Sequence, residues 1–148
     1  AREPRDQAPR FLLRALRDPD GANLYRIQVI KGWIDKKGKS HELIYDVAVS
    51  GDRKIGKDGR ARQPVGSTVN IENATYTNTI GAAMLGTHWE DPDFDPKQDA
   101  FYYVRVLEIP TPRWTTHDAA FFDIDRPDNV PATIQDRAYT SPIWYSAL

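Results

Sequence analysis

Hydrophobic and polar residues alternate with a period of two along several short segments of the chain, as expected of half-buried β-strands. In residues 25–31, Ile27 and Val29 fall on one face and the residues between them fall on the other. Residues 42–49 add a run of β-branched and aromatic side chains, and residues 101–109 carry the strongest strand pattern in the chain. These three segments are therefore predicted to be strands.

Turn-forming residues and proline limit how further strands are placed. Residues 35–38 have a turn-forming sequence, so the first two strands are predicted to pair as a hairpin. The Thr-rich segments 68–71 and 75–80 also favour strands. A last strand is predicted at residues 138–145, where Pro142 favours an edge or a bulge because proline cannot donate to the ladder.

Helix signals are scarce in this sequence. Eleven prolines and nine glycines are spread along the chain and leave little room for a long helix. Residues 116–122 are predicted to form one short helix capped by Thr115 or Thr116, whereas the pattern of residues 11–15 is ambiguous. The prediction is an all-β fold: an antiparallel β-sandwich, immunoglobulin- or fibronectin-like, with long loops and at most one or two short helices.

The length of the chain indicates a single domain. A chain of 148 residues is in the range that builds one hydrophobic core, so residues 1–148 are predicted to form one β-sandwich. Residues 1–10 are expected to be a flexible lead-in, and the glycine-rich, basic residues 51–67 an exposed loop. Because the chain starts at Ala1 and not at Met, we expect that an upstream segment has been removed.

Composition excludes several classes of partner and site. The net charge is −1, so no long-range field attracts the chain to nucleic acid or to an anionic membrane surface. No segment approaches the roughly 18 consecutive apolar residues that a membrane span needs. Cysteine is absent, which excludes disulfides, thiolate zinc sites and a cysteine nucleophile within this chain.

The chain contains three histidines and many carboxylates, the side chains from which metal sites are built. His41, His88 and His117 are far apart, and none forms the close pair that places two zinc ligands on one face. Alternating carboxylates resemble a calcium loop at Asp91, Asp93, Asp95 and Asp99. This segment departs from the EF-hand because Pro96 replaces the turn glycine and Tyr102 replaces the bidentate glutamate. Consecutive Asp-Pro turns are the preferred interpretation, and a calcium site is the alternative.

No catalytic motif is recognisable. The chain lacks a Gly-x-Ser-x-Gly elbow, and residues 51–59 lack the glycine spacing that holds phosphates. We therefore predict no catalytic residue and no cofactor in this chain.

Two segments are predicted to contact a partner. Pro110 and Pro112 hold the chain extended, so Arg113 and Trp114 would be presented from a stiff segment. An internal cation–π or capping contact is the equal alternative. Asp52 and Arg53 begin the basic loop and form the second candidate pair, with a simply solvated loop as the alternative. The tryptophans favour core or interface packing over a sugar-stacking platform.

Several strings resemble the C-terminal end of bacterial proteins grouped as domain of unknown function 3604. They are Arg26–Trp33, His41–Ala48 with Ser50–Arg53, Thr75–Ala82, Asp91–Pro96, Phe101–Trp114 and Ser141–Tyr145. That family resembles the polymerase-and-histidinol-phosphatase metallohydrolases, which hold a His/Asp-rich metal site in an upstream domain. None of those ligands matches a residue here. The resemblance implies that this chain is the β-rich C-terminal part of a longer, periplasmic or secreted protein.

The predicted function is a non-catalytic accessory β-sandwich that packs beside an upstream metal-dependent hydrolase domain of unknown substrate. The alternative is a free-standing module that binds carbohydrate or other copies of the chain. An enzyme in its own right is a third class, which the missing motifs disfavour.

Overall fold

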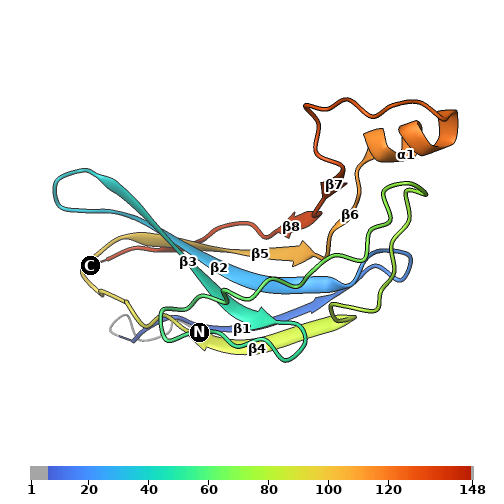
Figure 1. The fold of residues 1–148 in the computed structure, drawn as a ribbon. Helices are drawn as coiled ribbons and strands as arrows, with labels where there is room; N and C mark the ends of the chain where they lie inside the picture. Colours follow the sequence, from blue (N-terminus) through green and yellow to red (C-terminus); the bar gives the residue numbers. More distant parts are fainter. Residues whose placement is uncertain (1–6, 148) are drawn as a thin grey trace.

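Short antiparallel strands make up most of the regular structure in the computed structural model, which describes residues 7–147 (Figure 1). The strands are β1 (Arg10–Leu16), β2 (Leu24–Ile34), β3 (Ser40–Val49), β4 (Met84–Glu90), β5 (Ala100–Glu108), β6 (Thr111–Pro112), β7 (Thr133–Ile134), β8 (Arg137–Tyr139) and β9 (Ile143–Tyr145). A helix, α1 (Trp114–Phe122), lies between β6 and β7.

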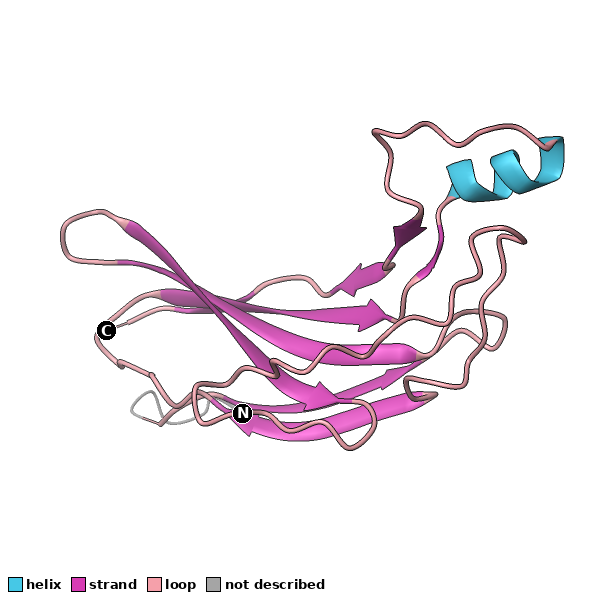
Figure 2. Cartoon of the chain, viewed as in Figure 1, coloured by secondary structure: helices cyan, strands magenta, loops and turns pink. Residues whose placement is uncertain are grey.

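Two β-sheets face each other and enclose the core (Figure 2). The larger sheet has the order β3-β2-β5-β8, and β9 pairs with another part of β5. The second sheet consists of β1 and β4. The buried cluster between them draws side chains from both layers, which is the definition of a sandwich. The predicted antiparallel β-sandwich is therefore confirmed.

The alternating pattern of β2 decides which side chains enter this core. Ile27 and Val29 are almost fully buried between the sheets, together with Tyr102 and Val104 of β5, while Leu85 approaches from β4. Burial of one such side chain stabilises the fold by about 1.5–3 kcal/mol. The strands predicted from alternation at residues 25–31, 42–49 and 101–109 are thus the inner part of the larger sheet.

The strands expected in the Thr-rich segments 68–71 and 75–80 are wrong. Both segments are irregular, with turns at residues 71–74 and 78–79, and one isolated bridge joins Asn70 to Thr75. The Thr68 hydroxyl donates to the carbonyl of Thr77 and accepts from its N–H, at 2.6 and 3.1 Å. Side-chain bonds of this kind compete with a backbone ladder, so β propensity alone misplaced these residues.

The second layer was not predicted. The ambiguous residues 11–15 lie in β1, and its partner β4 pairs with it from Arg10↔Glu90 to Leu16↔Met84. Gly86 interrupts the apolar pattern in the middle of β4, which hides this strand in the sequence. Arg10, the last residue of the expected flexible lead-in 1–10, belongs to β1. Residues 1–6 of that lead-in lie outside the described part of the chain.

The C-terminal prediction needs two corrections. The expected strand 138–145 is divided into β8 and β9, and both pair with β5. Pro142 lies in the gap, consistent with its missing N–H. The expected helix begins earlier, with Arg113 at the N-cap and no side-chain cap, and the Thr116 hydroxyl instead donates to the carbonyl of Ala132 at 2.7 Å.

The basic segment 51–67 is largely exposed, and it is bound to β3 at two points. The N–H of Asp46 donates to the carbonyl of Gly59 at 2.7 Å. The N–H of the buried Ala61 donates to the Asp46 carboxylate at 2.8 Å. The segment therefore runs along the outer edge of β3.

Candidate functional site

The acidic residues 91–99 connect β4 to β5, and the first of their carboxylates, that of Asp91, is buried in the core. Lys31 of β2 forms an ion pair with Asp91 at 2.6 Å, and neither side chain is more than 3% exposed. The Tyr102 hydroxyl of β5 donates to the same carboxylate at 2.7 Å. Burial and this hydrogen bond raise the pKa of Tyr102 well above its ordinary range. These three side chains form a buried polar cluster that links β2 and β5 to the segment after β4.

The other three candidate calcium ligands have separate partners. Asp93 accepts from the Tyr45 hydroxyl at 2.7 Å, Asp95 accepts from the backbone N–H of Lys97, and Asp99 accepts from that of Ala147. Within residues 7–147, no group of three or more His, Asp or Glu side chains is placed to hold a metal ion. The four carboxylates are therefore not brought together.

Only one of the three histidines takes part in a polar pair within the described residues. His41 bonds to Asp35 at 2.8 Å and stacks on Trp33 with ring centroids 5.2 Å apart. That bond, with the N–H groups of Lys39 and Lys37, lowers the pKa of Asp35. His88 and His117 are exposed on β4 and α1.

A projecting arm extends from the end of β5 and lies outside the two layers (Figure 1). It comprises residues 111–134, in which β6 and β7 form the stem and α1 the upper part. The N–H of Arg113 donates to the carbonyl of Ala132 at 2.9 Å, closing the stem. Of the helix residues, only Thr115 and Thr116 are buried.

The arm exposes large apolar side chains. Phe121 is 82% exposed and Trp114 is 65% exposed, and Phe122 and Ile124 are similarly open. The sequence predicted Trp114 as a contact residue but missed the other three, although the consecutive phenylalanines of a single short helix were a visible signal. Arg113 occupies the N-cap position of the helix, without a side-chain cap hydrogen bond.

The two residues of the second predicted contact pair, Asp52 and Arg53, have different surroundings in the structure. Arg53 donates to the carbonyls of Ser50 and Tyr25, at 2.9 and 2.7 Å, and its guanidinium lies 4.5 Å from the Tyr25 ring centroid. Burial lowers its pKa. Arg53 therefore holds the base of the loop, while Asp52 is exposed.

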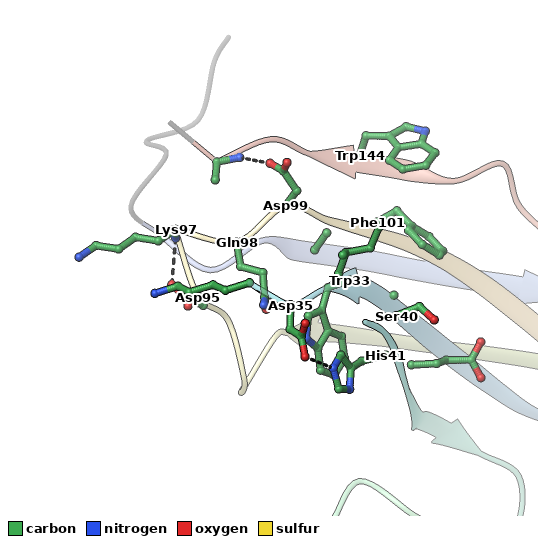
Figure 3. Close-up of a pocket in the computed structure, with 16 residues that line it drawn as sticks. Trp33, Asp35, Ser40, His41, Asp95, Lys97, Gln98, Asp99, Phe101 and Trp144 are labelled. Carbon is green, nitrogen blue, oxygen red and sulfur yellow. Dashed lines mark hydrogen bonds and ion pairs between the residues drawn. The ribbon is translucent and has the colours of Figure 1, made fainter. Parts of the chain in front are cut away.

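A cleft of about 870 Å³ lies where the β2–β3 hairpin separates from the start of β5 (Figure 3). Trp33 and His41 form one wall, and Phe101 and Trp144 stand on the other side of β5 and β9. Polar side chains between them come from residues 95–99 and from the hairpin. The cleft thus combines aromatic surfaces with hydrogen-bonding groups.

Comparison with known proteins identifies the family. A family model described as "Protein of unknown function (DUF3604)" matches residues 1–147. The chain belongs to the DUF3604 family. No curated protein and no solved structure matches this DUF3604 chain. In its described part, no helix has the length and apolar character to cross a bilayer.

Proposed function

We propose that this DUF3604 chain is a non-catalytic accessory β-sandwich that packs beside a metal-dependent hydrolase domain and docks to it through the projecting arm. The single observation that supports this most is the set of exposed apolar side chains on α1 and the residues after it. Any metal of the assembly would be held by the other domain, as the resemblance implies.

The arm has the properties of a surface that is covered by protein. A nine-residue helix is too short to be stable alone in water, so its stability depends on packing. Only its first turn packs within the chain. Trp114 and Phe121 are the kind of anchors that dominate interface energies when they enter a pocket. A protein partner would supply the missing apolar contact.

A covalently connected domain suits this arm better than a small ligand. The exposed side chains run from Trp114 in the first turn of the helix to Ile124, two residues after its end. Such a spread requires an extended complementary surface. An upstream domain of the same protein would meet the arm at a high effective concentration, without a strong intrinsic affinity.

The test begins with the coding region upstream of this chain. We expect the reading frame to continue into a domain with clustered His and Asp residues. That domain, expressed separately, should bind the 148-residue chain in isothermal titration calorimetry. Trp114→Ala should weaken binding at least about 30-fold, since about 2 kcal/mol is typical of an interface anchor. Trp144→Ala is the matched control, because this tryptophan is equally exposed but lies on β9.

Three results would overturn the proposal. The first is an upstream region that encodes no such domain. The second is binding that Trp114→Ala leaves unchanged. The third is a dimer of the chain in sedimentation that Trp114→Ala abolishes, because the arm would then meet a second copy.

A further inference from the structure

A row of aromatic side chains crosses the outer face of the larger sheet, the face turned away from β1 and β4. Its members, in order along the sheet, are Trp144, Phe101, Tyr103 and Tyr139, and we call this set the aromatic row. The ring centroids of successive members are 5.2, 6.4 and 6.3 Å apart. Trp144 is 72% exposed and Tyr139 is also exposed. The row is therefore continuous and open to solvent.

Strand register places these rings on one face. Phe101 and Tyr103 are two residues apart on β5, so they point to the same side. Phe101 is paired with Trp144 of β9, and Arg105, the next residue on that side, is paired with Tyr139 of β8. The division of the C-terminal strand thus brings one aromatic residue to each end of the row.

Gly32 lets the Phe101 ring lie flat on the sheet. Gly32 is paired with Phe101 across β2 and β5, and a Cβ atom at position 32 would overlap the ring. The planes of Phe101 and Tyr103 are within 11° of each other. Two neighbouring rings thus offer nearly parallel surfaces, which a flat ligand can follow.

The cleft continues the row at the Trp144 end. Trp144 and Phe101 line it together with Ser40 and Glu42, which provide hydroxyl and carboxylate groups, while Gln98 points toward Asp35 (Figure 3). Aromatic faces with hydrogen-bonding groups beside them suit a ligand that is apolar on its faces and polar on its edges.

The charges around the row favour a neutral ligand. The cleft is lined by Asp35, Glu42, Asp95 and Asp99 and by two lysines, so its carboxylates outnumber its cations. At the other end, the Arg105 guanidinium already donates to Gln28 at 2.8 Å. An anionic polymer would therefore meet excess negative charge in the cleft, while Arg105 and Arg137 lie beside Tyr139 at the other end.

We propose that the aromatic row and the adjoining cleft bind an extended, neutral polysaccharide chain. Sugar rings present C–H faces that stack on aromatic rings, and their hydroxyl groups point to the sides. Phe101 and Tyr103 offer parallel faces to such a chain, and Trp144 and Tyr139 are tilted from them by 48° and 39° at the two ends. The site is separate from the arm, and it does not depend on the proposed docking.

The test uses the 148-residue chain and a panel of neutral glycans. Affinity electrophoresis in gels containing hydroxyethyl cellulose, xylan or galactomannan identifies a binder, and calorimetry with the matching hexasaccharide measures Kd. We expect at least one polysaccharide to retard the chain. Trp144→Ala and Tyr139→Ala should each weaken binding at least about tenfold. Trp114→Ala, on the arm, should bind as the wild type does.

The folded state of each variant is verified by circular dichroism and urea unfolding, so that loss of binding is not loss of structure. The proposal is overturned if no polysaccharide of the panel retards the chain, or if Trp144→Ala binds like the wild type. It is also overturned if Trp144→Ala instead abolishes self-association or binding to the upstream domain, because the row would then be a protein interface. If Trp114→Ala keeps its self-association and its binding to the upstream domain, the interface lies at the aromatic row and not at the arm.

Discussion

The buried pair of Lys31 and Asp91 provides the sharpest test of how this sandwich is held together. Asp91 is fully buried and accepts from both Lys31 and the Tyr102 hydroxyl. In Asp91→Ala, the ammonium keeps only its bond to the carbonyl of Asp93, and the tyrosine hydroxyl loses its acceptor. The variant therefore leaves a buried charge without a counter-ion.

The expected loss can be worked out from burial. Removing one partner of a buried ion pair costs about 3–5 kcal/mol, and domains of this kind are stable by only about 5–15 kcal/mol. Asp91→Ala should thus remove a large fraction of the free energy of unfolding. Its sequence neighbour Glu90 pairs with Arg10 on the surface at 2.9 Å. Glu90→Ala should cost less than about 1 kcal/mol, because exposed pairs contribute little.

Urea unfolding followed by tryptophan fluorescence measures these differences at one pH. A second variant, Lys31→Met with Asp91→Leu and Tyr102→Phe, replaces all three polar groups by apolar ones of similar size. Because no charge or hydroxyl is then left unpaired, it should regain most of the stability lost in Asp91→Ala. The reasoning is refuted if Asp91→Ala and Glu90→Ala cost the same, or if the triple variant is no more stable than Asp91→Ala.

Three further predictions follow from single contacts. Burial alone would raise the pKa of Asp46, but the N–H of Ala61, Arg26 and Gln28 together lower it, so its stabilisation is present above about pH 4 and is lost on acidification. Urea midpoints from pH 7 to 3 should therefore fall more steeply for the wild type than for Asp46→Asn, and parallel curves would contradict this. Gly32→Ala should cost about 1–3 kcal/mol in thermal unfolding by displacing the Phe101 ring, whereas Gly86→Ala, whose Cβ has room, is the control. Replacing residues 113–132 by a short Gly-Ser linker should change the free energy of unfolding by less than about 1 kcal/mol, since the arm lies outside the core. Urea unfolding measures this change, and a larger loss of stability would mean that the sandwich depends on the arm.

The candidate sites were only partly accessible from the sequence. Trp114 was identified because two prolines precede it, and it is indeed exposed. Arg53 has the same kind of surface sequence, yet it packs on Tyr25 and bonds inward. The difference arises from Tyr25 of strand β2, which is 28 residues away in the chain. Exposure of a charged loop residue is decided by such distant neighbours and not by local composition.

The sequence by itself determined three strands of the larger sheet. β2, β3 and β5 are buried on at least one face, so their alternation follows directly from the need to remove apolar side chains from water. The tertiary structure alone decided the β1–β4 layer, the partners of the acidic residues and the aromatic row. Asp91 carries the same carboxylate whether it meets calcium, solvent or Lys31, and its partner is chosen only when β2 arrives from sixty residues away. Pairing of that kind depends on strand register, which is a property of the whole sandwich and of no single segment.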